Sequence, residues 1–407
     1  MKFDPNQNKV IEAPIRPLLV TAGPGSGKTA VLTRRITYIN EKYKIPFERI
    51  LVITFTKAAA ASMKSRFEKE NDVSSTSTFC TFHAFFYSII KDSNKNFQII
   101  SLKEKLNILK TVLLDNDEDL SSFGIQTFLD EISKIKNLGF EDEDFEPVST
   151  TKDKFYKYYK EYSNELKSEG YIDYDDFADL VLYLFSKDKI LFDKWSKKYT
   201  YCLIDEFQDI NQKQYDVIKL LFKDKGVFAV GDEDQSIYAF RGSSSDICIK
   251  FRNDFDADVL KLETNYRSTR KIVEASRKLI EFNTLRFDKK IIPSEDAKEG
   301  LFKIRGFGTV NEEYEGICKD VKNAMDNYNS VAILLRTNNI PDSLVYYLLK
   351  EKIKFNTENT LKLDKENEHI DDILTYFKIA DGDMTYKNLL KICNKPNRYI
   401  SRNFLAE

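Results

Sequence analysis

The sequence predicts a protein of the α/β class with a parallel, doubly wound sheet. Short apolar segments recur along the chain, and segments with the spacing of amphipathic helices lie between them. The apolar segments, each expected to form a strand, are 18–22, 50–54, 200–204, 227–230 and 258–262. Ligands of such sheets bind at the carboxyl ends of the strands. We therefore expect the functional residues directly after these segments.

The length and composition are those of a globular protein without an overall excess of charge. At roughly 100 to 200 residues per domain, the 407 residues predict two to four domains. The net charge of −2 gives no general basic excess, so any nucleic-acid site must be local. The five cysteines are scattered without a CxxC pair and there are only two histidines, which argues against a disulfide framework or a His-rich metal centre and favours the cytoplasm. The chain also shows no signal peptide and no run of about 18 apolar residues.

The strand pattern is interrupted once and then resumes in a second form. Residues 91–195 carry mostly helical spacing, with helices expected at 102–116, 122–136, 151–168 and 173–186. Further strands are expected at 301–304 and 331–335, and further helices at 310–327, 341–351, 367–379 and 386–393. The predicted domains are 1–90 with 196–265, a helical insertion at 91–195, a partial second α/β domain at 266–380, and the start of another helical insertion at 381–407.

A glycine-rich segment follows the first predicted strand and precedes a helix. Its residues are Ala22, Gly23, Pro24, Gly25, Ser26, Gly27, Lys28 and Thr29. A loop that wraps phosphates needs inward backbone N–H groups and no Cβ in the way. Lys28 would reach the β- and γ-phosphates and Thr29 would hold Mg²⁺, beside the positive end of the helix. The alternative is a plain glycine turn, because Ala22 stands where the strict pattern has glycine, but the flanking strand and helix favour the phosphate loop.

Carboxylates follow a second predicted strand, and an amide follows a third. Asp205 would bind Mg²⁺ and Glu206 would orient or deprotonate an attacking water. Alone, such a pair is more often a solvated strand end, but beside a phosphate loop the functional interpretation prevails. Gln235 could contact a γ-phosphate or the attacking water, or it could be a turn residue.

Six further motifs carry a resemblance to a known family. They are Phe3–Gln7, Ile53–Thr56, Thr78–Ala84, Asp205–Asp209 (DEFQD), Gly231–Gly242 (GDEDQSIYAFRG) and Asn265–Ser268 (NYRS). With the glycine loop, and in this order, they resemble the UvrD/Rep/PcrA family of superfamily one DNA helicases. The resemblance implies a RecA-like P-loop NTPase sheet with a helical insertion, followed by part of a second RecA-like domain.

The same resemblance implies ATP and Mg²⁺ as ligands and gives individual residues a role. Gln7 would pair with the edge of adenine, and Tyr266 would stack on it. Arg267 would reach the γ-phosphate from the second lobe. The resemblance also agrees with the roles in phosphate, Mg²⁺ and water binding that were assigned above to Lys28, Asp205, Glu206 and Gln235.

Single-stranded DNA and its junctions with duplex are the partners that the resemblance implies. The residues expected to contact DNA are Phe55, Thr81, His83, Tyr238, Phe240 and Arg241. Aromatic stacking is worth roughly 1–3 kcal/mol per base whatever the base is. The alternative for each aromatic residue is a place in the core. Phe240 stands where the family usually has tryptophan, which reduces the stacking area.

Two later motifs of the family, His-x-x-Lys-Gly-Leu and Thr-Arg-Ala, do not occur in the sequence. We therefore expect the N-terminal part of a longer helicase or a naturally shortened relative. Because a missing catalytic arginine costs about 10³–10⁵ in rate, these residues would bind ATP but hydrolyse it poorly. The implied activity is that of an ATP-dependent 3′→5′ DNA helicase or translocase, for example in DNA repair. The alternatives are a regulatory or assembly subunit without motor activity, and the motor part of a helicase–nuclease.

Overall fold

The computed structural model describes most of the chain, in two compact units. The described residues are 2–71, 77–93, 95, 97–118, 124–138, 145–236, 246–283, 286–337, 340–357, 368–396 and 398. The N-terminal unit is Met1–Phe302 and the C-terminal unit is Lys303–Glu407. The domain boundaries expected from the sequence stay predictions.

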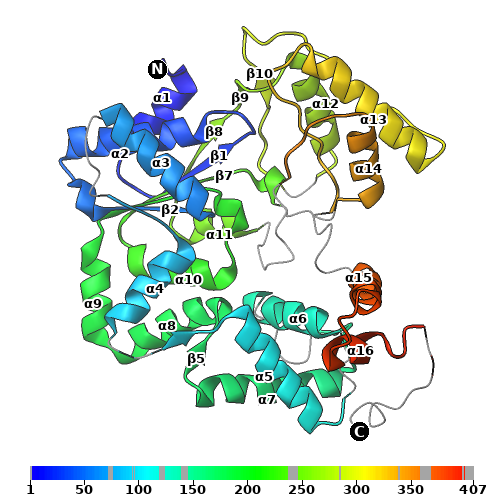
Figure 1. Cartoon of the computed structure of the whole chain (residues 1–407). Coiled ribbons are helices and arrows are strands. Elements are labelled where there is room, and N and C mark those ends of the chain that lie inside the picture. The colour runs from blue at the N-terminus through cyan, green and yellow to red at the C-terminus, as the bar shows by residue number, and fades with distance from the viewer. Residues whose placement is uncertain are drawn as a thin grey trace. The chain divides into compact units, whose positions relative to one another are not determined.

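The N-terminal unit is organised around a six-stranded parallel sheet (Figure 1). Its strands are β1 (Leu18–Ala22), β2 (Ile50–Thr54), β3 (Thr78–Thr81), β6 (Tyr201–Ile204), β7 (Gly226–Gly231) and β8 (Asp258–Leu262). They lie in the order β3-β2-β6-β7-β1-β8, and every pairing is parallel. The predicted α/β class and its five strands are therefore confirmed. The sequence reasoning missed β3, which pairs with β2 at the edge of the sheet.

Two hydrophobic cores cover the two faces of this sheet. Side chains of successive strand residues point to opposite faces, so Leu18 and Val20 lie in one core and Leu19 lies in the other. The first core also contains residues of α1 (Pro5–Glu12), α2 (Lys28–Tyr43) and α3 (Lys57–Asn71). The second contains residues of α4 (Phe82–Asp92), α8 (Phe177–Lys187), α9 (Lys189–Lys198), α10 (Gln212–Phe222) and α11 (Ile247–Asp254). Burial on both faces explains why the strands read as continuous apolar runs.

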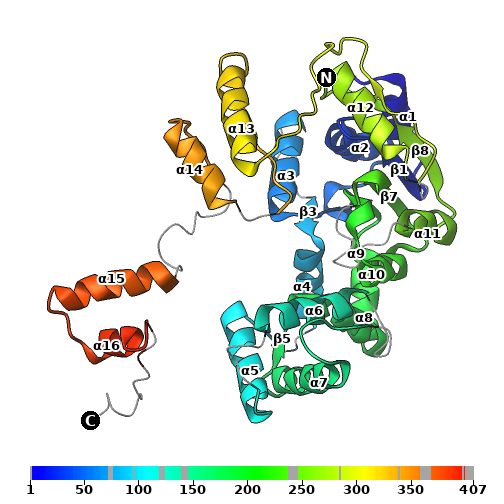
Figure 2. The same ribbon diagram turned by 90° about the vertical axis from the view of Figure 1, so that its right-hand side faces the viewer.

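Three helices of the predicted insertion form a core of their own. They are α5 (Leu102–Asp115), α6 (Ile125–Leu138) and α7 (Lys152–Ser168), which gather beside the short pair β4 (Gln98–Ile99) and β5 (Tyr171–Ile172) (Figure 2). Phe128 and Phe155 meet at its centre with ring centroids 4.7 Å apart. The predicted helices of this region are confirmed, with shifted ends, and α9 was not predicted. No helix within the described ranges is long and apolar enough to cross a membrane.

The last part of the N-terminal unit forms a separate two-stranded sheet. A short strand β9 (Thr264–Asn265) follows β8, and it pairs in parallel with β10 (Ile292–Pro293). The helix α12 (Arg270–Ile280) connects them. This unit also contains the single-turn 3₁₀ helices η2 (Tyr174–Asp176), η3 (Phe207–Asp209) and η4 (Glu233–Gln235).

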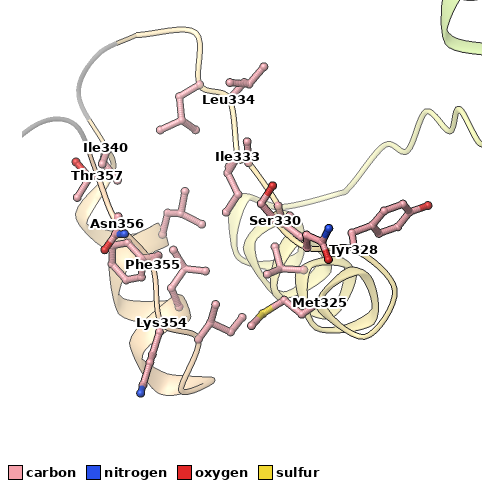
Figure 3. A pocket seen from close by; sticks show the side chains of 18 of the residues that line it. Met325, Tyr328, Ser330, Ile333, Leu334, Ile340, Lys354, Phe355, Asn356 and Thr357 are labelled. Carbon is pink, nitrogen blue, oxygen red and sulfur yellow. The ribbon is translucent and has the colours of Figure 1, made fainter. Parts of the chain in front are cut away.

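The C-terminal unit is helical in its described part. Its helices are α13 (Val310–Met325), α14 (Asp342–Lys350), α15 (Glu368–Ala380) and α16 (Tyr386–Ile392), all at predicted positions. The strands predicted at 301–304 and 331–335 were wrong, because neither segment pairs with another described strand. Residues 330–335 instead line an apolar pocket of about 910 Å³ between α13 and α14 (Figure 3). An apolar run needs a neighbouring strand before it can form a sheet, and the sequence pattern cannot supply that information.

Candidate functional site

Three neighbouring strands bring the predicted nucleotide residues to one edge of the sheet. β6, β7 and β1 are adjacent, with Ile204 beside Ala229 and Thr21 beside Gly231. Because parallel strands end at the same edge, the glycine loop, the acidic pair and the turn before Gln235 emerge together. Ala22 itself is the last residue of β1 and is fully buried.

The glycine loop has the backbone of an anion site. Gly25 and Gly27 have φ values of 68° and 81°, a conformation that other residues adopt only with strain. The Ser26 hydroxyl donates to the carbonyl of Gly23 at 2.7 Å. α2 begins at Lys28, and no described side chain caps its N-terminus. The amides of its first turn have no intrahelical partner and are not taken by a capping side chain, so they are available to an anion.

A lysine of the loop and a carboxylate after β6 are in direct contact. Lys28 Nζ lies 3.1 Å from Glu206 Oε2, and the lysine side chain is only 12% exposed. Glu206 has a φ of 49°, which is uncommon for a residue with a side chain and marks strain that is often found at functional sites. Thr29 follows Lys28 in the first turn of α2 and is half-buried.

Two acids near Glu206, the buried Asp205 and the half-buried Asp209, favour a bound cation. Burial and the charge of Glu206 raise the pKa of Asp205 to about 6, and the same causes raise the pKa of Asp209 to about 6. Asp209 Oδ1 is buried without a partner among the described residues. A divalent cation would stabilise these carboxylates in their ionised form, so the residues fit Mg²⁺.

The described residues contain no group of three or more His, Cys, Asp or Glu side chains that could hold a metal ion alone. Mg²⁺ is usually held by one or two carboxylates together with substrate phosphates. Asp205, Glu206 and Thr29 are therefore sufficient only if a phosphate is bound with the ion.

A residue that the sequence reasoning left without a role joins the two acidic turns. Gln208 Nε2 donates to Glu206 Oε2 at 2.9 Å, and Gln208 Oε1 accepts from the backbone N of Asp232 at 2.9 Å. Gln208 is 2% exposed. It is the glutamine of the DEFQD motif, so the motif itself was the signal that could have identified it.

Gln235 lies in η4 and is half-buried. Its Nε2 donates to Asp232 Oδ2 at 2.5 Å. Through Asp232 and Gln208 it is connected to Glu206. The structure thus joins Gln235 to the acidic pair by a chain of hydrogen bonds.

Gln7 connects the first helix to the glycine loop. Its Nε2 donates to the carbonyl of Ser26 at 3.0 Å, and its Oε1 accepts from the backbone N of Asp4 at 3.0 Å. The Asp4 carboxylate caps α1 in return, because its Oδ1 accepts from the backbone N of Gln7. One N–H and one lone pair of the Gln7 amide remain for a ligand. Its predicted contact with adenine stays a prediction.

A buried arginine fastens α1 to the site and was missed by the sequence reasoning. Arg35 in α2 is 0% exposed, and its guanidinium donates to the carbonyl of Ile11 at 2.9 Å and to the hydroxyl of Tyr201 at 2.6 Å. It also contacts the carbonyls of Val10, Ala13 and Pro14. A charged residue in a helix gives no sequence signal of such burial.

The NYRS segment lies against the glycine loop. Asn265 Nδ2 donates to the carbonyl of Pro24 at 2.8 Å, and Tyr266 N donates to the carbonyl of Gly25 at 2.9 Å. The Tyr266 hydroxyl is bonded to the Asp4 carboxylate. Burial and that hydrogen bond raise the pKa of Tyr266 to about 12. Arg267 is exposed, and all four residues belong to the N-terminal unit.

The predicted DNA residues have different surroundings. His83 is exposed, and its ring meets the edge of Tyr174 with centroids 5.7 Å apart. Tyr174, which the sequence reasoning missed, is 49% exposed. Phe55 is half-buried, whereas Thr81 is 6% exposed and its hydroxyl accepts from Ala84 N at 3.3 Å. Tyr238, Phe240 and Arg241 lie outside the described residues.

Comparison with known proteins agrees with this geometry. The model of the UvrD/REP helicase N-terminal domain matches residues 3–256, and that of the UvrD-like helicase C-terminal domain matches residues 260–407. The chain belongs to the UvrD/REP helicase family. The family assigned from the sequence motifs is therefore confirmed.

Relatives in this family include proteins named ATP-dependent DNA helicase PcrA. That of Bacillus subtilis (strain 168) is 32% identical over 426 residues, which cover 100% of this chain and 57% of the relative. That of Staphylococcus epidermidis (strain ATCC 12228) is 31% identical over 410 residues, which cover 97% of this chain and 56% of the relative. That of Staphylococcus aureus (strain Mu50) is 30% identical over 406 residues, which cover 96% of this chain and 55% of the relative. The chain thus spans little more than half the length of these relatives.

Proposed function

We propose that the chain supplies the ATP-binding and ATP-hydrolysing part of an ATP-dependent DNA helicase or translocase. The observation that carries this proposal is the meeting of the glycine loop, the Lys28–Glu206 pair and the Asp205 carboxylate at one edge of the sheet. The names of the UvrD/REP relatives support it.

ATP binding follows from the geometry of the loop. The first-turn amides of α2 and the Lys28 ammonium take the β- and γ-phosphates. Thr29 and Asp205 hold Mg²⁺, which when bound neutralises charge on the phosphoryl oxygens. Gln7 and Tyr266, which converge on Asp4, hold the adenine.

Hydrolysis requires a base that is placed next to the γ-phosphate. Glu206 orients the attacking water and accepts its proton. Gln208 fixes the Glu206 carboxylate from one side, at 2.9 Å. Lys28 shares the same carboxylate oxygen, so transfer of the lysine to a phosphate would free Glu206 to act on water.

Coupling of hydrolysis to movement on DNA, in the 3′→5′ direction, is the next step of the proposal. Gln235 senses the γ-phosphate, and the adjoining Tyr238 and Phe240 contact the DNA, while Arg267 contacts the γ-phosphate. The test is Gln235→Ala, which we expect to reduce DNA-stimulated hydrolysis and unwinding. Unchanged stimulation and unwinding would refute the coupling.

The DNA partner is single-stranded DNA and its junctions with duplex. Exposed His83 and half-exposed Tyr174 form an edge-to-face pair on which an unstacked base can lie, and Phe55 is the third aromatic residue of this platform. Tyr238, Phe240 and Arg241 are proposed as further DNA contacts. Thr81 contributes by capping α4, which fixes the position of His83.

The direct experiment measures ATP hydrolysis by the 407-residue chain with and without single-stranded DNA. We expect ATP binding, slow hydrolysis because the Thr-Arg-Ala arginine is absent from these residues, and stimulation by DNA. Glu206→Gln should bind ATP and lose the hydrolysis. ATP binding without any effect of DNA would favour a regulatory or assembly subunit, and no ATP binding would refute the proposal.

A further inference from the structure

A cluster of buried charges lies beneath the turn that follows β7. The Lys289 side chain is 0% exposed. Its Nζ contacts the carboxylates of three consecutive residues, namely Asp232, Glu233 at 2.9 Å and Asp234 at 3.1 Å. Arg286 also pairs with Asp234, at 3.0 Å. None of the sequence motifs includes Lys289 or Arg286.

Such a cluster persists only if the charges compensate one another. Removing an ion from water is costly, and one partner left alone in the interior is strongly unfavourable. Burial lowers the pKa of Lys289, but the charges of Asp232 and Glu233 raise it more, so the net shift is upward and Lys289 stays protonated. Glu233 Oε1 also accepts from the backbone N of Phe287 at 3.1 Å. The acidic turn is therefore held in place by the segment 286–289.

The cluster reaches Gln235 through a single carboxylate. Asp232 binds Lys289 through Oδ1 and accepts from Gln235 Nε2 through Oδ2 at 2.5 Å. Its backbone N donates to Gln208, which donates in turn to Glu206. The orientation of Gln235 thus depends on where the Asp232 carboxylate lies, whereas the link toward Glu206 starts from the Asp232 backbone.

The segment that carries Lys289 has a second connection to the nucleotide site. It leads into β10, where Pro293 pairs with Asn265 of β9. Asn265 holds the glycine loop through the carbonyl of Pro24. Residues 286–293 therefore contact both the turn before Gln235 and the segment that supports the phosphate loop.

We infer that Lys289 is a positioning residue for ATP hydrolysis, which sets the orientation of Gln235 through the shared carboxylate of Asp232. Lys289 touches neither the phosphates nor the water in this account, and it acts only through Asp232. The inference rests on the proposed function. It adds a residue whose loss should lower the rate of hydrolysis while ATP affinity is kept.

The test is a double-mutant cycle on the 407-residue chain with Mg²⁺, ATP and single-stranded DNA. Lys289→Met should lower the hydrolysis rate by about 10- to 100-fold, as expected for a misplaced group, with KM for ATP within about twofold. Gln235→Ala should have a similar effect. The double variant should be no slower than Gln235→Ala alone, because both changes remove the same contribution. Effects that multiply would overturn the inference.

Two further variants separate positioning from loss of folding. The double variant Lys289→Met, Glu233→Gln also removes one of the carboxylates that Lys289→Met alone leaves without a counter-charge. Lys289→Arg keeps the positive charge but replaces the compact ammonium by a planar guanidinium. Thermal unfolding identifies the folded variants, and the cycle is measured on those. If none of the three folds, Lys289 is a stability residue only and the inference is wrong.

The control is Lys225, a half-buried lysine at the opposite end of β7 from the acidic turn. Lys225 precedes β7 and donates to the carbonyls of Ser196 and Tyr199. Lys225→Met should leave the hydrolysis rate within about twofold, because it lies away from the catalytic edge. If Glu206→Gln still hydrolyses ATP, the proposed function itself is wrong. If Glu206→Gln is inactive but the effects of Lys289→Met and Gln235→Ala multiply, only the role of Lys289 is wrong.

Discussion

The side-chain amide of Asn265 donates a hydrogen bond of 2.8 Å to the carbonyl of Pro24, joining residues 241 positions apart. The next residue, Tyr266, donates from its backbone to Gly25. On the other side of the loop, Gln7 holds the carbonyl of Ser26. The glycine loop is therefore held by two segments that are distant from each other in sequence, and its shape depends on both.

Gly25→Ala should damage this clamp more than an equivalent change elsewhere. A Cβ at Gly25 would lie 2.8 Å from Asn265 Oδ1 and 2.8 Å from Arg267 Cβ. The positive φ alone costs about 1–2 kcal/mol. We expect a further loss of stability from the crowding and ATP binding weakened by about tenfold or more.

Gly170→Ala is the matched control for this change. Gly170 has a similar φ of 72°, but a Cβ there would meet no described atom within 4 Å. It should lose about 1–2 kcal/mol and keep ATP affinity. Urea unfolding and ATP titration measure both effects, and equal losses of affinity in the two variants would contradict the clamp.

Asp205→Asn should stabilise the protein above pH 6 while it removes the effect of Mg²⁺ on nucleotide affinity. The native pKa of Asp205 is raised to about 6 by burial and by Glu206, so the ionised carboxylate destabilises the fold at neutral pH. With a shift of about two units, the gain is at most about 3 kcal/mol.

The pH dependence of this effect has a definite sign. For wild type, this group makes the free energy of unfolding rise as pH falls from about 7 to 4, because the folded state binds the proton first. In Asp205→Asn, this contribution to the rise in the free energy of unfolding should be absent. The stabilities of the variant and the wild type should therefore become similar below about pH 4. A variant less stable than wild type at pH 7.5 would show that the pKa is not raised.

Arg35→Met should destabilise the fold and loosen the helix that carries Gln7. The guanidinium donates to four backbone carbonyls and to Tyr201, and buried acceptors left without donors cost about 1–3 kcal/mol each. We expect a loss of about 3 kcal/mol and a reduced preference for ATP over GTP. Arg34→Met is the control, because Arg34 is an exposed neighbour paired with Glu41. Equal stability of the two variants would refute this role.

Tyr174→Ala should weaken binding of single-stranded DNA by roughly 1–3 kcal/mol, the usual contribution of one stacked base. Tyr183→Ala provides the comparison, because Tyr183 in α8 is 51% exposed, much like Tyr174 at 49%. Fluorescence anisotropy with a labelled oligonucleotide measures both affinities. Equal affinities would exclude Tyr174 from the DNA platform.

The sequence was sufficient to predict the sheet and the glycine loop that follows its first strand, because both rest on local patterns. A strand buried on both faces is a continuous apolar run, and a loop around phosphates needs glycine at fixed positions. Gly25 and Gly27 indeed have the positive φ values that this loop requires. The prediction of a strand at 331–335 was wrong because a strand needs a neighbouring strand, which the sequence pattern does not specify.

The residues that sequence reasoning missed act through contacts between distant segments. Lys289 and Arg35 are charged, and charged side chains are usually exposed, so their burial follows only from the fold. Tyr174 lies in a turn remote in sequence from His83 and meets it in space. Gln208 belongs to a recognised motif, but its bridge from Glu206 to Asp232 depends on the adjacency of β6 and β7.

The central claim is that the loop beginning at Ala22 and Lys28 at its end hold the phosphates of ATP. Its most direct test is equilibrium binding of a fluorescent ATP analogue with Mg²⁺ to the chain, to Lys28→Met and to Lys42→Met. Lys42 lies in the last turn of the same helix, where it contacts Tyr38. We predict that Lys28→Met weakens binding by about tenfold or more, while Lys42→Met binds like wild type. Equal affinity in all three proteins would contradict the account.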